Sequence, residues 1–217
     1  MAEQTKATFA NDVSRPVVMF FPNLYEAKAV VVNGKTSGKA RFSANFLFDA
    51  DNPDLKVLSA TIKQVAATKW PGRELSELHL PLAKGDKLAD KAKAKNKDGE
   101  FQRGKWVLVA RSDFAPQLAV VREGKVVEQD GTNRIAVKNE FYPGVKTLIR
   151  VTLVPYDAPG NGQDGITAYL DVVVSTNVGK RLAGSGPSAA EIFKGYVGVA
   201  TDEDPTAGAS SDDEIPY

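Results

Sequence analysis

The sequence of 217 residues contains no cysteine and a single histidine, His79. The absence of cysteine excludes disulfides, thiolate nucleophiles and cysteine-ligated zinc, and it fits a cytosolic protein. One histidine cannot form a histidine cluster, and no Ser-His-Asp triad can be assigned around it. We therefore expect His79 to be structural or exposed, and we expect no metal and no cofactor.

Long apolar runs are also missing. No stretch approaches the roughly 18 residues that a membrane-spanning helix needs, and the N-terminus lacks a basic segment followed by an apolar signal core. The length and the 42% hydrophobic content suit one sizeable core. We expect a cytoplasmic protein that does not contact a membrane.

Two motifs with catalytic potential are incomplete. Gly34-Lys35-Thr36 looks like the end of a phosphate-binding loop, but Ala29 stands where that loop needs its first glycine, so a turn is favoured. Asp49, Asp51 and Asp54 could hold Mg²⁺ as in a nuclease, but they precede a predicted helix, where capping is favoured. We predict that the chain is not an enzyme and keep a degenerate metal site on these aspartates as an alternative.

The charge that is present is unevenly divided. The net charge is +1, but residues 201–217 hold six acids and no Lys or Arg, which leaves 28 basic and 21 acidic residues in the body. A basic body joined to an acidic segment predicts a polyanion-binding surface with an internal competitor. Because counterion release drives phosphate binding, this segment should weaken DNA binding most at low salt.

Strand patterns dominate the body. Asn33-Gly34 predicts a hairpin turn, and Pro22-Asn23 should end the first strand. The expected strands cover residues 16–21, 39–48, 105–111, 117–122, 126–127, 145–156 and 166–174.

One helix is expected within these strands. It should be capped by Asp51 or Asn52, carry Pro53 in its first turn and end at Pro71-Gly72. Residues 71–104 show little periodicity and are expected to form a long loop. The pattern predicts a mainly β fold: an OB-fold-like five-stranded barrel with an inserted helix and long loops. We expect a binding domain over residues 1–200 and a disordered acidic tail over residues 201–217.

Proteins hold single-stranded nucleic acid with a basic groove along its backbone and with aromatic rings on which bases stack. This chain offers both kinds of residue on its predicted strands. For Trp106, core packing is the favoured interpretation, whereas stacking and core packing stay open for Tyr156. The candidate phosphate-binding residues are Lys39, Arg41, Arg103, Lys105, Arg111, Lys146 and Arg150, and the candidate rings are Trp106 and Tyr156.

The last six residues place three carboxylates before an apolar tip. They closely resemble the C-terminal peptide of bacterial and phage single-stranded DNA-binding proteins, with a tyrosine where that family often has phenylalanine. The resemblance implies that the tip binds partner enzymes; a merely solubilising tail is the alternative. The residues of the predicted partner-binding tip are Asp212, Asp213, Glu214, Ile215, Pro216 and Tyr217.

The body also resembles phage single-stranded DNA-binding proteins, over about residues 15–196. The segments that carry the resemblance are 21–24 (Phe-Pro-Asn-Leu), 140–144 (Glu-Phe-Tyr-Pro-Gly) and 152–156 (Thr-Leu-Val-Pro-Tyr), followed by 165–166, 179–182 and 190–193. It implies an OB-fold core, sequence-independent binding of single strands and a tail that recruits replication or recombination enzymes. In the short-tailed coliphage type, a tyrosine matching Tyr156 is implicated in DNA binding. The acidic end of that type is longer than this one, which leaves the partner open.

Together these features predict a protein that coats single-stranded DNA and protects it during phage replication, recombination and repair, in the host cytoplasm. Duplex DNA would bind more weakly. We also hypothesise that the acidic tail occupies the basic groove when DNA is absent. The alternative is a strand-annealing recombination mediator or an accessory factor that also binds duplex DNA.

Overall fold

Five strands close into a barrel in the computed structural model, which describes residues 6–32, 35–160 and 162–182. Each barrel strand pairs with the next, and the last pairs back with the first; β5 and β9 run parallel and the other neighbours antiparallel. In barrel order the strands are β2 (Val17–Val32), β3 (Lys35–Asp49), β5 (Lys105–Ser112), β9 (Gly165–Ser175) and β8 (Lys146–Tyr156). The predicted mainly β, OB-fold-like barrel is confirmed.

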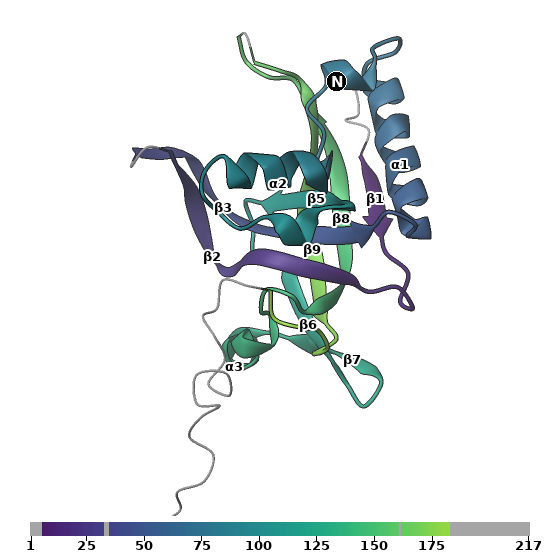
Figure 1. Cartoon of the computed structure of the whole chain (residues 1–217). Helices are drawn as coiled ribbons and strands as arrows, with labels where there is room; N and C mark the ends of the chain where they lie inside the picture. Colours follow the sequence, from purple (N-terminus) through teal and green to yellow (C-terminus); the bar gives the residue numbers. More distant parts are fainter. Residues whose placement is uncertain (1–5, 33–34, 161, 183–217) are drawn as a thin grey trace, which may run out of the picture. The chain divides into compact units, whose positions relative to one another are not determined.

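The remaining elements surround this barrel (Figure 1). Strand β1 (Ala7–Ala10) pairs with β8, β4 (Leu82–Lys84) pairs with β5, and the β6–β7 hairpin extends the sheet from β9. The bounds of the other elements are β6 Gln117–Arg122, β7 Lys125–Gln129, α1 Pro53–Lys69, α2 Gly85–Lys93 and α3 Gly131–Ala136, with short 3₁₀ turns η1 Leu75–Glu77, η2 Glu100–Gln102 and η3 Lys138–Glu140.

The strand alternation predicted from the sequence places the core inside the barrel. Phe46 and Phe48 of β3 are fully buried there, with Leu108 of β5 and Leu153 of β8. Helix α1 adds Leu58 and further apolar residues to the same core, beside β1 and β8. The predicted cap is also confirmed, because the Asn52 side chain accepts a hydrogen bond from the Asp54 backbone N–H.

Two predictions about local structure were wrong. Strand β2 does not end at Pro22-Asn23 but continues to Val32, because a register shift between Phe20 and Asn23 absorbs the proline in a bulge. The region expected to be a long loop contains α2, β4 and three-residue turns. Helix α2 is rich in Lys, Asp and Ala, so only a short apolar stripe with Leu88 and Ala89 marked it.

Helix α2 and η2 cover part of the barrel's outer face. Phe20 of β2, Leu47 of β3 and Val107 of β5 form a second, smaller apolar cluster there, against which Leu88 and Phe101 pack. This cover makes part of the outer face of β3 and β5 inaccessible. Predicted site residues on this outer face therefore differ in whether they lie under the cover or beside it.

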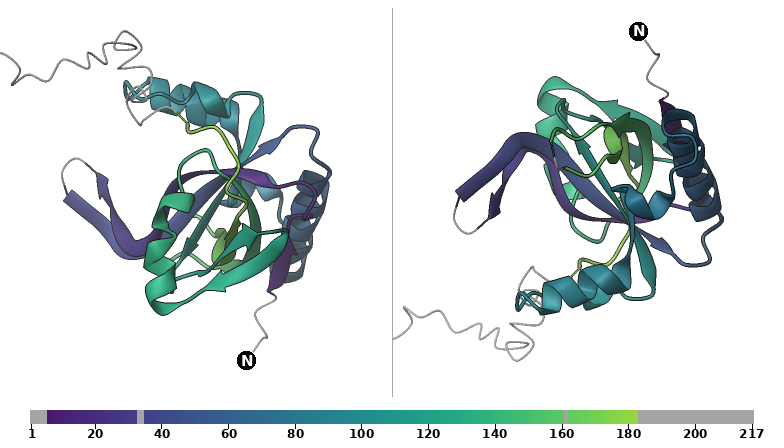
Figure 2. Two further views of the ribbon diagram at one scale, coloured as in Figure 1. Left: turned by 90° about the horizontal axis from the view of Figure 1, so that it is seen from below. Right: turned by 90° about the horizontal axis from the view of Figure 1, so that it is seen from above.

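The β2–β3 hairpin projects beyond the barrel, as both views in Figure 2 show. Its strands pair from Val18–Leu47 out to Val32–Lys35. The predicted turn at Asn33-Gly34 and the tail with its tip, residues 201–217, lie outside the described residues. No helix among the described residues is long and apolar enough to cross a membrane.

Candidate nucleic-acid interface

An outward-facing phenylalanine marks the bulge in β2. Val17 and Met19 face the core, so simple alternation would turn Phe21 inward as well. Its φ of +49° and the register shift instead turn the ring outward, where it is 60% exposed. A left-handed backbone costs a bulky residue about 1–2 kcal/mol, and bulges commonly re-aim a side chain beside a functional site. The Phe21 ring packs against Phe20 and Phe101, with centroid distances of 5.0 and 6.4 Å.

Phe21 lies in a cavity of about 540 Å³, which we call the basic groove. Strands β2 and β3, the end of β5 and the segment after α2 form its walls. None of the described residues that line it is acidic. The lining residues are Phe21, Asn23, Lys28, Ala29, Lys39, Arg41, Ser43, Lys97 and Arg111. An exposed ring among five cations is the combination that binds single-stranded nucleic acid, by base stacking and backbone attraction.

One carboxylate holds two of the five cations. Asp113 pairs with Lys39 at 3.2 Å and with Arg41 at 2.9 Å. The hydrogen bond from Lys39, followed by the charge of Arg41, holds the pKa of Asp113 below its usual range. The carboxylate is therefore ionised at neutral pH. Within the described part of the chain, no ion pair involves the other three cations, Lys28, Lys97 and Arg111.

A second exposed ring follows this carboxylate. Phe114 is 82% exposed, and its backbone N–H donates to the Ser112 hydroxyl at the end of β5. The preceding residue, Asp113, contacts two cations of the groove, so Phe114 lies next to the groove in the chain. Its ring is a second surface on which a base could stack.

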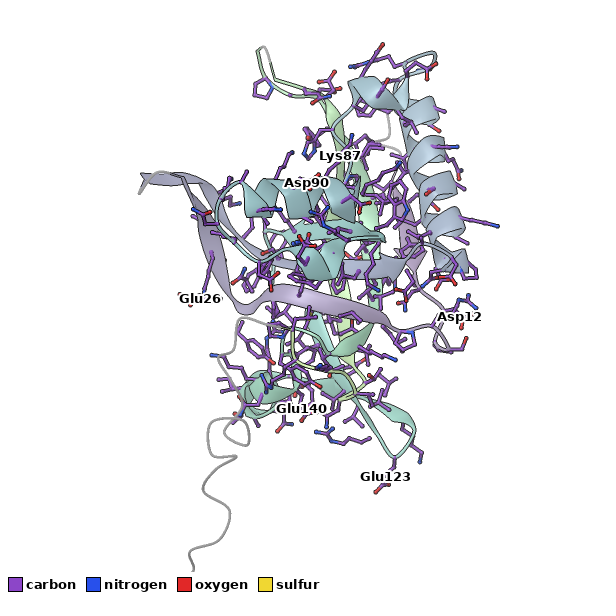
Figure 3. All side chains as sticks on the ribbon, viewed as in Figure 1. Asp12, Glu26, Lys87, Asp90, Glu123 and Glu140 are labelled. Atoms are coloured by element: carbon purple, nitrogen blue, oxygen red, sulfur yellow. The ribbon has the colours of Figure 1, made fainter. Side chains whose placement is uncertain are left out.

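The nine predicted nucleic-acid-binding residues fall into three places, and the structure brings only Lys39, Arg41 and Arg111 together in the groove. Arg103 and Lys105 lie at the other end of β5. Arg103 donates to Glu100 at 2.7 Å and to Asp90 of α2, labelled in Figure 3, at 2.9 Å, and these contacts raise its pKa. Lys105 pairs with Asp49.

Trp106 lies apart from the groove. Its half-buried ring packs on the main core and lines a different cavity of about 370 Å³ along α1. The ammonium group of Lys84 lies 5.9 Å from the ring centroid. This position matches the favoured interpretation of Trp106 as a packing residue.

The third group lies on β8. Lys146 and Arg150 are exposed on its outer face, opposite the buried set that the alternation predicted. Tyr156 is half-buried where β8 turns toward β9, opposite Gly165. A Cβ on Gly165 would lie 2.9 Å from the Tyr156 hydroxyl oxygen, so the ring sits closely against β9. Burial, and then Asp164, raise the pKa of Tyr156.

Sequence reasoning missed Phe21, Lys28, Lys97 and Phe114 as site residues. The pair Phe20-Phe21 carried no signal for the site, because regular alternation would turn Phe20 outward and Phe21 inward, whereas the bulge turns both rings outward. Phe114 was a lone ring in a turn before a proline, Pro116. Nothing in the local pattern marked Lys28 or Lys97, whose places depend on the fold.

Two of the three aspartates of the alternative metal site have other partners. Asp49 pairs with Lys105, and Asp54 accepts hydrogen bonds from the Asp12 backbone N–H and the Arg15 guanidinium. Across residues 6–32, 35–160 and 162–182 there is no group of three or more His, Asp or Glu side chains that could hold a metal ion. The alternative of a magnesium-dependent enzyme gains no support from this arrangement.

Comparison with known proteins gives one family match. The profile described as the ssDNA-binding protein of Enterobacter phage Enc34 matches residues 12–206. A solved structure of the single-stranded DNA-binding protein from bacteriophage Enc34 in complex with ssDNA is 19% identical, with a TM-score of 0.55, over 82% of this chain and 89% of that chain. Another structure of the Enc34 protein is 17% identical, with a TM-score of 0.54, over 87% and 89%. The curated proteins searched contain no match.

Proposed function

The chain belongs to the family of the single-stranded DNA-binding protein of Enterobacter phage Enc34, and on that premise we propose that it binds single-stranded DNA independently of sequence. The observation that carries the proposal is the basic groove, in which five cations surround the outward-turned ring of Phe21. The cations attract backbone phosphates, and a base stacks on the ring. Neither contact depends on which base is present.

The exposed ring also determines the preferred form of DNA. A base can stack on Phe21 only when it has left its own duplex stack, so single strands gain a contact that duplex DNA does not. Stacking contributes about 1–3 kcal/mol per base. Duplex DNA should therefore bind more weakly, through the cations alone.

The biological role that follows is coating. A protein that stabilises unpaired strands suppresses hairpins by mass action and covers the backbone that nucleases attack. We place this activity in phage replication, recombination and repair, within the host cytoplasm. The protein acts by binding and catalyses no reaction.

The acidic tail adds recruitment to this role. Residues 201–217 carry six acids, and Asp212, Asp213 and Glu214 precede the apolar Ile215, Pro216 and Tyr217. Such a tip can present charge and an apolar anchor to a replication or recombination enzyme. The same six acids oppose the attraction between the basic body and DNA, an effect that salt screens.

A titration over several salt concentrations tests these points together. Full-length protein and protein ending at residue 200 are each titrated with oligo-dT and with duplex of equal length. We expect tighter binding to oligo-dT, and tighter binding by the shortened protein at low salt only. Equal affinity for both forms of DNA would contradict the stacking model, and rapid annealing of complementary strands would favour the strand-annealing alternative.

A further inference from the structure

A second cavity combines rings with cations on another part of β2. This aromatic cleft has a volume of about 240 Å³ and is lined by Pro22, Tyr25, Lys138, Asn139, Phe141, Tyr142, Pro143 and Arg181. Its walls come from β2, from the η3 segment and from residues after β9. None of these lining residues belongs to the basic groove.

The rings of the cleft form a platform with a cation on it. The guanidinium of Arg181 lies 4.4 Å from the centroid of the Tyr142 ring, and the Tyr142 hydroxyl donates to the Gly179 carbonyl at 2.9 Å. This hydrogen bond fixes the ring, and the ring in turn supports the guanidinium. Planar guanidinium groups and aromatic rings are the two surfaces on which proteins stack unpaired bases.

The cleft is also positively charged. The Lys138 ammonium lies 5.8 Å from the centroid of the Tyr25 ring. In the part of the chain that the structure describes, neither Lys138 nor Arg181 takes part in an ion pair. Glu140, labelled in Figure 3, pairs with Arg122 instead. A phosphate entering the cleft would therefore meet two cations that no carboxylate of the described residues neutralises.

Tyr25 contributes a polar atom without a partner. Its hydroxyl oxygen is buried and makes no hydrogen bond among the described residues, although the ring lines the cleft. Burial raises the pKa of Tyr25 to about 12, so the hydroxyl keeps its proton at neutral pH. Tyr25 therefore adds an uncharged ring to the wall of the cleft.

The chain connects the cleft directly to the basic groove. Phe21 lines the groove and Pro22 lines the cleft, and the Cα atoms of consecutive residues are about 3.8 Å apart. We propose that the aromatic cleft is a second nucleotide subsite, which takes an unpaired base and its phosphate from a strand that crosses β2 out of the basic groove. This inference rests on the proposed function and extends the DNA path beyond the groove.

Photochemical cross-linking tests the proposal on the full-length protein. Oligo-dT carrying a single 5-iodouracil at successive positions is bound, irradiated and mapped by mass spectrometry. We expect one set of positions to cross-link to Phe21 and a neighbouring set to Tyr142 or Tyr25. Cross-links to Phe21 without any to the two tyrosines would overturn the subsite and leave the proposed function intact. Failure to bind oligo-dT at all would overturn the proposed function itself.

A double variant provides a readout that does not depend on photochemistry. Lys138→Ala with Arg181→Ala should make the slope of log K against log salt shallower by about 0.7 for a long oligo-dT, the change expected for the one phosphate that the cleft takes. A short oligo-dT that fills only the groove should show the wild-type slope. Lys91→Ala with Lys125→Ala removes the same charge from residues that line neither cavity, and serves as the control.

Two results would count against the subsite. An equal loss for short and long oligomers would mean that the two cations act only through general charge. The cleft would be assigned to a protein ligand if the double variant bound both oligomers like wild type and the acidic peptide Asp-Asp-Glu-Ile-Pro-Tyr shielded the cleft residues from solvent.

Discussion

The two ends of β5 carry cations on the same outer face of the barrel, but their surroundings differ. At one end, Arg111 opens into the basic groove beside Phe21. At the other end, Lys105 pairs with Asp49, and Arg103 just before it pairs with Asp90 and Glu100. The strand pattern predicts an exposed cation at each end, but in the folded chain only the end with Arg111 opens into the groove.

Helix α2 accounts for part of the difference, and Asp49 at the end of β3 provides the carboxylate that pairs with Lys105. A Cβ on Gly85, the first residue of α2, would lie 1.9 Å from the Gln102 carbonyl oxygen, so the helix begins in direct contact with the segment before β5. The side chain of Asp86 accepts a hydrogen bond from the Gly104 backbone N–H at 3.1 Å. This contact brings acids and an apolar cover to one end of β5 and leaves the other end open. A basic strand residue becomes a DNA-binding candidate only where no neighbouring element covers it and neutralises its charge.

The largest expected effect concerns the ring of the open end. Phe21→Ala should weaken binding to oligo-dT by about 1–3 kcal/mol, the contribution of one stacked base, which is roughly 5- to 150-fold in Kd. Phe21→Tyr keeps the ring and should bind like wild type. Fluorescence anisotropy with labelled oligo-dT measures both. If Phe21→Ala bound oligo-dT with wild-type affinity, the ring would not be part of the DNA interface.

A glycine at the same position separates binding from folding. Phe21→Gly also removes the ring, but it accepts the φ of +49° without the cost of a side chain in the left-handed region. Its DNA binding should be as weak as that of Phe21→Ala, while its melting temperature should be higher than that of the alanine variant. A parallel loss of binding and stability across the two variants would mean that the effect is structural.

The next effect concerns groove cations that have no ion-pair partner among the described residues. Lys28→Ala with Lys97→Ala should make the negative slope of log K against log salt shallower by about 1.4, at about 0.7 per phosphate contact on a single strand. Lys56→Ala with Lys63→Ala on α1 removes the same charge outside the groove and should leave the slope near its wild-type value. Salt titrations of both pairs distinguish local contacts from net charge.

A smaller effect of opposite sign is expected at Asp113. Asp113→Asn should release Lys39 and Arg41 for phosphate and tighten oligo-dT binding a few-fold at low salt, an advantage that high salt screens. Weaker binding by this variant would show that the carboxylate positions the two cations rather than competing with phosphate.

The pH dependence of stability provides a check on the same carboxylate. Its folded-state pKa lies below the ordinary value of 3.8, so its contribution to stability is present above about pH 3.8 and is lost as the pH falls through the folded pKa. The difference in melting temperature between wild type and Asp113→Asn should therefore be constant from pH 6 to 8 and shrink below about pH 3.8.

The smallest effect is expected at the covered end. Arg103→Ala should change oligo-dT affinity by less than about twofold, because Glu100 and Asp90 already neutralise the guanidinium. Its melting temperature should fall slightly, since exposed ion pairs contribute little to stability. A large loss of affinity would show that DNA displaces these acids and extends over α2.

Particular residues show how far the sequence could predict this structure. Alternation correctly assigned Phe46 and Phe48 to the inner face of β3. Capping signals located the start of α1 at Asp51 or Asn52, of which Asn52 is the cap. The strand pattern with one inserted helix predicted the barrel, and the resemblance to phage single-stranded DNA-binding proteins implied the same fold together with the function class. The open and covered ends of β5 could not be distinguished, because the covering residues around Leu88 and Phe101 precede the strand in a region with little apolar periodicity.

The position of Phe21 shows a second limit. Its neighbours follow the alternation of a strand, and only the bulge that accommodates Pro22 in a continuous β2 turns the ring outward. A bulge depends on pairing with β3, which local propensity does not encode. For the same reason, the nine candidates chosen by charge and ring type separated into three groups in the folded chain.

The most direct test compares two cations of one strand, six residues apart on the same face. Arg111→Ala and Lys105→Ala are titrated with oligo-dT over the same series of salt concentrations. If the basic groove is the DNA site, Arg111→Ala should make the negative slope of log K against log salt shallower by about 0.7, and Lys105→Ala should leave it unchanged. A loss at Lys105 as large as that at Arg111 would contradict the assignment of the groove.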